Sequence, residues 1–292
     1  MKSLPRMGLV TFGAGSPNWR AAARRLGRQA EESGRFTKIS VSSDQSLRAN
    51  YPEFFQQHRG MLRPEVRGFG YWLWKPFLIQ RAMQTWVNEV DCVLYVDGGC
   101  EINFDPESQD RWEQYLDWSM QGPGRLAMQL VGHSEQTWSK TDTMLALGLT
   151  LEERLSDQIQ TAPSFYRLDS SNLDFSAEWL EMCIIENYRF VDDTQSRVPN
   201  DASFRDHRHD QAIFSGLIKR HGARLIPDET YWAPDWELDG RRFPIWAPRN
   251  RTRVSILDKS VSGKAIRFSE RLYSKIYREI NASRFSGRML KE

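Results

Sequence analysis

The sequence predicts an α/β protein in which a mixed, mainly parallel sheet is flanked by helices and followed by a helical C-terminal tail. Short apolar runs of β-forming residues alternate along the chain with longer segments of helical periodicity. The alternation opens with a strand, a helix and a second strand, an order that favours parallel pairing through a crossover. With 292 residues the chain can bury a large core.

Glycine, serine and proline residues mark the ends of the elements in the first strand–helix–strand segment, residues 7–43. Residues 7–13 ("MGLVTFG") form an apolar run that ends in glycine, as a buried strand does. Ser16 and Pro17 supply a cap and a first-turn residue, which predicts a helix that ends at Gly34. Residues 36–43 then have the composition of a second strand.

The middle of the chain repeats this alternation. Pro76 and Pro106 are each placed to open a helix. Further strands are expected at residues 91–97, 125–132, 158–168 and 223–227. Further helices are expected at residues 140–149, 174–188 and 209–222. The polar segment 189–208 between the last two helices is expected to be a loop.

The composition changes near the C-terminus. We expect one domain over residues 1–253 and a basic, amphipathic helical extension over residues 254–292. Helices of this kind can lie on anionic membrane surfaces, which would suit a protein peripheral to the plasma membrane. A helix packed on the main domain with a solvated basic face explains the pattern equally well.

Charge and cysteine content narrow the class of protein. The chain has 40 basic and 38 acidic side chains, a formal net charge of +2, which gives no indication of a nucleic-acid partner. Three scattered cysteines, Cys92, Cys100 and Cys183, suit neither a disulfide framework nor a zinc site. No apolar run approaches the roughly 20 residues of a membrane-spanning helix, and no signal peptide is recognisable. We therefore expect a cytoplasmic protein.

Asp97 is the first candidate site residue. It ends an apolar strand, and ligands of α/β sheets bind outside the carboxyl ends of strands. Gly98 and Gly99 follow, so a phosphate or a metal ion can approach the backbone closely. Glu101 offers a second oxygen donor to Mg²⁺ or Mn²⁺. Alternatively, Asp97 caps a turn whose glycines only provide positive φ angles.

Two further polar groups lie near predicted helix starts. "HRHDQAIF" contains His207, His209, Asp210 and Gln211, a spacing that does not match a zinc helix and that ordinary helix capping also explains. The second polar group, in "TWSKTDTM", consists of Trp138, Lys140 and Asp142. A cation there can meet an anionic ligand, although a solvated helix start explains the pattern as well.

The stretch "RGFGYWLWKPFLIQ" (67–80) places aromatic residues around a lone cation, Lys75. If it is extended, Trp72 and Trp74 face one side of the chain. Pro76 favours an extended Lys75 immediately before a helix, where an anion is stabilised. We therefore interpret Trp74 and Lys75 as part of a wall beside Asp97, with Lys75 facing phosphate.

Three motifs, "GFGYWLWKP", "YVDGGCEIN" and "HDQ", together resemble bacterial glycosyltransferase-like proteins of surface-polysaccharide and lipopolysaccharide synthesis, which look like relatives of the GT-A glycosyltransferases. The resemblance extends over about residues 8–253. It implies a GT-A-like sheet and a hexosyltransferase-type enzyme. The donor would be a nucleotide sugar, first of all a UDP-sugar, and the acceptor a glycan or a lipid-linked sugar.

The resemblance also implies roles for single residues. Asp97 matches the first acid of the GT-A "DxD" motif, which holds Mn²⁺ or Mg²⁺ against the donor diphosphate. Gly99 stands in the place of the second acid. Either Glu101 supplies the missing metal ligand, or Lys75 and backbone N–H groups hold the diphosphate without a metal ion. Asp210 and Gln211 match a pair that lines the donor sugar, and together with Asp97 they are the predicted catalytic residues. The Asp210 carboxylate would hold hydroxyl groups of the donor sugar or, alternatively, act as a base.

Other residues implied by the resemblance are distributed along the chain. The nucleotide would meet the end of the first strand, at Thr11, Phe12 and Gly13. Gln158 and Gln160 would lie on the strand that faces the acceptor. Beside the resemblance, we add Trp138, Lys140 and His209 as candidate contacts of the acceptor or the donor sugar. The chemistry suits such a site, because glycosyl transfer passes through an oxocarbenium-like state and the departing diphosphate needs compensating positive charge.

Two other classes of function remain open at this stage. The missing "DxD" acid suits a catalytically inactive carbohydrate-binding or scaffold protein on the same fold. A glycoside hydrolase would need Asp97 and Glu101 to flank one glycosidic bond, although they lie very close together in the sequence.

Overall fold

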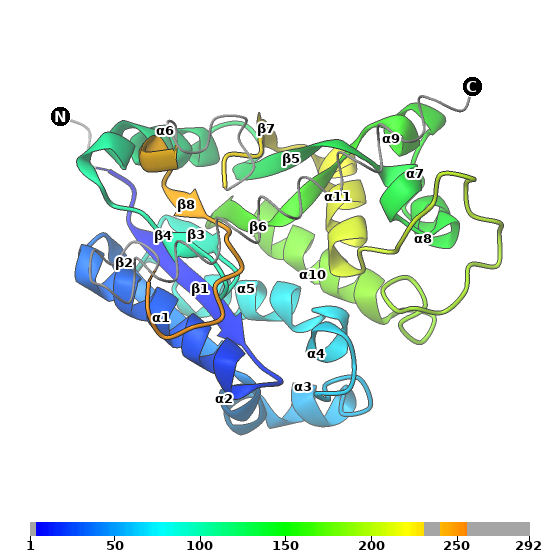
Figure 1. The fold of residues 1–292 in the computed structure, drawn as a ribbon, viewed down its shortest axis with the longest axis horizontal. Coiled ribbons are helices and arrows are strands. Elements are labelled where there is room, and N and C mark those ends of the chain that lie inside the picture. Colours follow the sequence, from blue (N-terminus) through cyan, green and yellow to red (C-terminus); the bar gives the residue numbers. More distant parts are fainter. Residues whose placement is uncertain (1–3, 231–239, 256–292) are drawn as a thin grey trace.

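The computed structural model describes residues 4–230 and 240–255 and is built around one six-stranded sheet (Figure 1). Its strands lie in the order β2-β1-β3-β6-β5-β7. They are β1 (Met7–Gly13), β2 (Phe36–Ser43), β3 (Cys92–Tyr95), β5 (Arg125–Ser134), β6 (Asp157–Arg167) and β7 (Arg224–Pro227). A small antiparallel ribbon pairs β4 (Glu101–Ile102) with β8 (Ile245–Trp246).

The pairing directions confirm the predicted sheet type. β1 runs parallel to β2 and to β3, and β5 runs parallel to β7. β6 is antiparallel to both of its neighbours, β3 and β5. Five strands therefore point one way and β6 points the other, so the sheet is mixed and mainly parallel.

Eleven α-helices lie within the described residues. The longer ones are α1 (Pro17–Ser33), α5 (Trp74–Thr85), α6 (Gln109–Met120), α10 (Ser170–Ile184) and α11 (Asp210–His221). The shorter ones are α2 (Asp44–Asn50), α3 (Pro52–Gln57), α4 (Gly68–Tyr71), α7 (Glu135–Trp138), α8 (Thr141–Ala146) and α9 (Leu151–Leu155). No described helix is long and apolar enough to cross a bilayer.

The sheet separates two apolar layers, because alternate side chains of a strand point to opposite faces. Val93 and Tyr95 of β3 join a core cluster with α5, α10 and α11. Cys92 and Leu94 join a second cluster with α1 and α6 on the other face. Figure 1 shows the corresponding arrangement, with the sheet between these two sets of helices.

The predicted elements are largely confirmed. β1 and β2 have the predicted bounds, and the other predicted strands and helices form with ends shifted by a few residues. Residues 189–208 form the predicted loop. Most of the predicted extension 254–292 lies outside the described residues, so its helical character stays a prediction. The prediction missed the short helices α2, α3, α4, α7 and α9 and the short ribbon.

The aromatic stretch after Arg67 departs from the prediction. Residues 68–72 are not extended but form a left-handed turn, with φ between 50° and 95° at all five positions. Left-handed backbone is unfavourable for residues with a Cβ, and Phe69, Tyr71 and Trp72 all adopt it. α5 then begins at Trp74, so Lys75 is helical and is not held extended by Pro76.

A second left-handed turn explains why α10 ends at Ile184, before the predicted residue 188. Glu186, Asn187 and Tyr188 have φ angles of 48°, 55° and 68°. They turn the chain into segment 189–209, which leads to α11. The Tyr188 hydroxyl lies 2.9 Å from Nδ1 of His58, which fixes the turn against the residues after α3.

Gly68 in the first left-handed turn and Gly15 between β1 and α1 differ in what surrounds them. A Cβ on Gly68 would lie 2.4 Å from the Trp72 ring, whereas a Cβ on Gly15, which also has positive φ, would meet nothing within 4 Å. We predict that Gly15→Ala lowers the free energy of unfolding by about 1–2 kcal/mol from backbone strain alone. Gly68→Ala should cost more, because the Trp72 ring must move as well.

Chemical denaturation of the two variants measures this difference. Equal losses of stability would show that the contact between residue 68 and Trp72 does not constrain the turn.

Candidate functional site

The ammonium group of Lys75 is the centre of the candidate site. Lys75 is 2% exposed, and its Nζ lies 2.8 Å from Oδ2 of Asp210 and 3.7 Å from Oδ1 of Asp97. Nζ also donates a 2.7 Å hydrogen bond to Oγ1 of Thr161. These partners come from α11, from the end of β3 and from β6, so one cation joins three elements that are remote in the sequence.

The charges of this cluster depend on one another. Burial opposes the charged form of Lys75, but the carboxylates of Asp210 and Asp97 outweigh it and raise the lysine pKa. Burial raises the pKa of Asp210 to about 6, even though Lys75 acts in the opposite direction. With all three groups ionised the cluster carries a net charge of −1, which favours binding of a cation over binding of an anion.

Asp97 is the accessible member of the cluster. Its side chain is 46% exposed, whereas those of Lys75 and Asp210 are 3% and 5% exposed. The Tyr95 hydroxyl donates a 2.7 Å hydrogen bond to Oδ1 of Asp97 and orients it. Asp97 follows the carboxyl end of β3, next to that of β1. Because β2 and β3 lie on opposite sides of β1, this is a topological switch point, where α/β sheets bind ligands.

The role predicted for Lys75 changes with this geometry. Lys75 is within reach of Asp97, as expected. Its ammonium group is buried, however, and its contacts are with Asp210, Thr161 and Asp97. We therefore assign Lys75 to holding the two carboxylates in place, and not to direct contact with a phosphate.

Glu101 also departs from its prediction as a metal ligand beside Asp97. It is fully buried, and its Oε1 lies 3.2 Å from Nε of Arg25 on α1. Asn250 donates to Oε1, and Gln29 and Ser255 donate to Oε2. Glu101 thus lies in the α1 layer, whereas Asp97 contacts the α5 and α11 layer. Among the described residues, no group of three or more acidic, histidine or cysteine side chains is arranged to hold a metal.

Gly13, Gly98 and Gly99 were expected to let a ligand approach the backbone, but in the structure other parts of the chain approach them instead. A Cβ on Gly13 would lie 2.2 Å from the Trp19 carbonyl oxygen. A Cβ on Gly98 would lie 3.0 Å from the Phe12 carbonyl oxygen, and one on Gly99 would lie 3.2 Å from the Trp19 ring. The glycines therefore let the end of β1 and the turn after β3 pack against α1.

The predicted nucleotide contacts at the end of β1 are part of the core. Thr11 is fully buried, and Phe12 is 4% exposed. The Phe12 ring stacks on Trp74 at 3.9 Å between centroids, and the Trp74 indole N–H donates to the Gly68 carbonyl. These aromatic side chains fix the left-handed turn against β1. Because the Phe12 and Trp74 rings stack on each other, a nucleobase cannot insert between them.

Several residues predicted to face a sugar are joined by hydrogen bonds. The Gln211 amide donates to Oε1 of Gln158, and the Gln158 amide donates to Oγ of Ser139 and to the Trp138 carbonyl. Gln160 donates separately to Asp228, at 3.1 Å. The start of α11 is thereby linked to β6 and to the start of α8.

Lys140 and Asp142 have a structural role that the sequence did not reveal. The buried Lys140 ammonium donates to the carbonyl groups of Arg189, Asp192 and Thr194. Asp142 accepts backbone N–H groups from segment 189–209, and these hydrogen bonds lower its pKa to about 2 although burial opposes them. The predicted anion contact of Lys140 is replaced by these anchors.

His207 and His209 are buried beside this segment. Nε2 of His207 bonds the Phe190 carbonyl at 2.9 Å, and Nδ1 accepts the Lys140 backbone N–H. Nδ1 of His209 bonds the Val191 carbonyl at 2.7 Å. Burial lowers the pKa of both imidazoles, so both are neutral near pH 7.

Sequence reasoning missed two groups near the predicted site. Arg249 is exposed, and its backbone contacts the position of Gly99; the Arg251 guanidinium lies 4.6 Å from the centre of the Trp19 ring. Asp193 accepts a hydrogen bond from the Tyr71 hydroxyl. Neither lies in a motif, and only the fold brings segments 189–209 and 249–251 to the same region as the "GFGYWLWKP" and "DGG" sequences.

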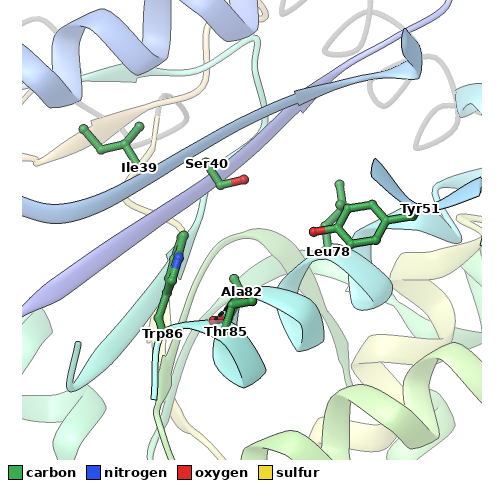
Figure 2. A pocket seen from close by; sticks show the side chains of 7 residues that line it. All are labelled: Ile39, Ser40, Tyr51, Leu78, Ala82, Thr85 and Trp86. Carbon is green, nitrogen blue, oxygen red and sulfur yellow. Dashed lines mark hydrogen bonds between the residues drawn. The ribbon is translucent and has the colours of Figure 1, made fainter. Parts of the chain in front are cut away.

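A cavity of about 220 Å³ lies away from this cluster, between the edge strand β2 and helix α5. Figure 2 shows its lining, with Ile39 and Ser40 on β2, and Leu78, Ala82 and Thr85 on α5. No predicted site residue lines it, and no charged side chain does.

The raised pKa of Asp210 gives a pH dependence with a defined sign. A carboxyl group that binds its proton more tightly in the folded state stabilises the fold fully below its unfolded pKa of 3.8, and this contribution is lost as the pH rises through about 6. Two pKa units correspond to about 3 kcal/mol. The free energy of unfolding of the wild type, relative to Asp210→Asn, should fall by up to this amount between about pH 4 and 6.

Urea denaturation of both proteins across this pH range tests the prediction. Parallel stability profiles, or a wild-type advantage that grows with pH, would contradict the assignment of Asp210.

Comparison with known proteins adds one finding. No protein-family model and no curated protein matches the chain. Among solved structures, the chain is similar to a glycosyltransferase involved in the glycosylation of the major capsid of PBCV-1, with 11% sequence identity and a TM-score of 0.43. The match covers 83% of this chain and 92% of that protein. A likeness at this level decides neither activity nor ligand.

Proposed function

We propose that this protein is a glycosyltransferase of the hexosyltransferase type, which takes a sugar from a nucleotide-sugar donor. A UDP-sugar is the first donor to test. The acceptor would be a glycan or a lipid-linked sugar of surface-polysaccharide synthesis. The observation that carries the proposal is the half-exposed Asp97 at the switch point between β1 and β3, supported from below by Lys75 and Asp210.

The charge of the cluster supports a divalent cation at Asp97. Mg²⁺ and Mn²⁺ sites of this kind use one or two carboxylates and are completed by substrate phosphates and water. Asp97 supplies one such carboxylate, and Glu101, bonded to Arg25, does not supply the second. A bound cation would neutralise charge on the diphosphate leaving group. The exposed Arg249, whose backbone lies beside Gly99, would add positive charge if its side chain turned toward the diphosphate.

The protein's own groups divide the remaining tasks. The Asp210 carboxylate is buried with Lys75, so it keeps Asp97 and the start of α11 in a fixed geometry. Tyr95 holds one oxygen of Asp97, and Gln211 connects the site to β6 through Gln158. A hydrolase with Asp97 and Glu101 as its catalytic pair is not supported, since the two carboxylates lie in opposite layers.

A thermal-shift screen with nucleotide sugars, with and without Mn²⁺, tests the proposal. We expect at least one UDP-sugar to raise the melting temperature, with a larger shift when Mn²⁺ is present. Asp97→Asn should remove the Mn²⁺-dependent part and abolish transfer, because it removes the charge that would hold the cation. Glu101 is a poor control because its loss disrupts the core; Asp105→Asn, another acid after a strand, is the matched control.

The alternative is a catalytically inactive carbohydrate-binding or scaffold protein, favoured by the glycine at position 99. Binding of glycan with neither transfer nor hydrolysis of any donor would support it. No melting-temperature shift with any nucleotide sugar would contradict the glycosyltransferase proposal.

A further inference from the structure

The turn that carries Asp97 has two glycines at its centre, so its own side chains do not fix its shape. The Cys100 N–H donates to the Asp97 carbonyl at 2.9 Å and closes the turn around Gly98 and Gly99. Neither glycine has a positive φ angle. Because glycine restricts the backbone less than any other residue, contacts from outside the turn must hold it in one conformation.

Arg25 on α1 supplies two of these contacts. Its side chain is buried, and its Nη2 donates to the Gly98 carbonyl at 3.2 Å and to the Cys100 carbonyl at 2.6 Å. Its Nη1 donates to the carbonyl oxygens of Asn250 and Thr252, at 3.0 and 2.8 Å. One buried guanidinium thus joins the turn after β3 to the chain after β8, which passes beside α1 (Figure 1, orange).

The segment after β8 holds the remaining carbonyl of the turn. The Asn250 backbone N–H donates to the Gly99 carbonyl at 2.8 Å. The Asn250 side-chain amide donates to Oε1 of Glu101 at 2.6 Å, and the same oxygen lies 3.2 Å from Nε of Arg25. The three carbonyl groups that follow Asp97 therefore have fixed donors, and both donor residues contact one buried carboxylate.

The glycines are themselves required for these contacts. A Cβ on Gly98 would lie 3.2 Å from Cα of Ala23 on α1, and a Cβ on Gly99 would lie 3.3 Å from Cα of Arg249. Larger residues would push the turn away from α1 and from the segment after β8. The same two glycines that leave the turn flexible thus bring it within reach of its donors.

We propose that Arg25 is a positioning residue for Asp97, which fixes the backbone of the glycine turn and thereby the direction of the exposed carboxylate. The Tyr95 hydroxyl orients one oxygen of this carboxylate, but it does not hold the main chain that follows. Groups behind a metal ligand change metal affinity by about 10–100-fold when they are removed. On the proposed function, on which this step rests, the ligand served is the divalent cation at Asp97.

A purely structural role for Arg25 is the competing explanation. Two of the four carbonyl groups that it binds belong to residues 250 and 252, so the guanidinium would then only attach this segment to α1. Its loss would lower the stability of the whole protein without a specific effect on residues 97–100. The order of the turn and the global stability must therefore be measured separately.

Arg25→Lys separates the two explanations. Lysine keeps a positive charge beside Glu101, but its single ammonium group lacks the planar fork that reaches four carbonyl oxygens. Amide hydrogen exchange of the metal-free protein reports on the turn through the Cys100 N–H, and on the sheet through the Val96 N–H, which donates to Val10. We expect the exchange rate of Cys100 to rise about tenfold more than that of Val96.

Mn²⁺ binding is the second measurement. Titration with Mn²⁺ in the presence of UDP, followed by the electron paramagnetic resonance signal of free Mn²⁺, should show binding weakened about tenfold or more in Arg25→Lys. Arg28→Lys is the matched control, because Arg28 lies on the same helix and donates to the Arg253 carbonyl from an exposed position. The control should change neither the exchange of Cys100 nor the affinity for Mn²⁺.

Asn250→Ala reaches the turn from its other side and covers the case in which Arg25→Lys does not fold. It removes the hydrogen bond to Glu101 and those by which Oδ1 holds Thr252. The exchange rate of Cys100 should again rise by more than that of the sheet amide. Equal rises at both amides in these variants would overturn the positioning role.

The outcomes also distinguish this proposal from the proposed function. If the wild type binds Mn²⁺ with UDP and the variants bind it equally well in spite of a loosened turn, the positioning of Asp97 is overturned and the glycosyltransferase proposal stands. A wild type that binds neither Mn²⁺ nor any nucleotide sugar contradicts the proposed function. The exchange of Cys100 then decides by itself whether Arg25 fixes the turn.

Discussion

The buried ammonium of Lys75 is the constraint on which the arrangement of this molecule depends. A charge without solvent must be surrounded by partners, and here they come from the end of β3, from β6 and from the first turn of α11. Breaking such a pair from one side leaves a buried charge uncompensated, at a cost of about 3–5 kcal/mol. The same requirement that joins these elements also brings Asp97 and Asp210 together.

The sheet was predictable because its signals are local and agree with one another. Runs of β-forming residues indicated the strands, three of them ended by glycine or by Asp97, and the crossover rule indicated the parallel pairing of β1 and β2. The two left-handed turns were not predictable. Phe69, Tyr71 and Trp72 disfavour that conformation individually, and only their tertiary contacts, such as the stacking of Trp74 on Phe12, make it stable.

The candidate site was predicted in part, for a similar reason. Asp97 was found from its place after a strand, and the pairing of Lys75 with Asp210 gives both residues a reason to stand together. Whether a polar residue faces solvent or the interior depends on packing that no single sequence displays. Glu101 and Lys140 were therefore assigned to ligands, although one is the counterion of Arg25 and the other binds carbonyl groups of the chain.

Segment 189–209 has a further consequence for how the site opens. It contains no helix or strand, and its anchors come largely from one short stretch, through the side chains of Lys140, Asp142 and Thr143. Residues that depend on the same few anchors exchange their amide protons together, as one cooperative unit. Because this unit includes Val191 and Asp193, local unfolding would remove both of these polar neighbours of the His209 ring in a single step, while Tyr71 and Trp72 would stay against the ring.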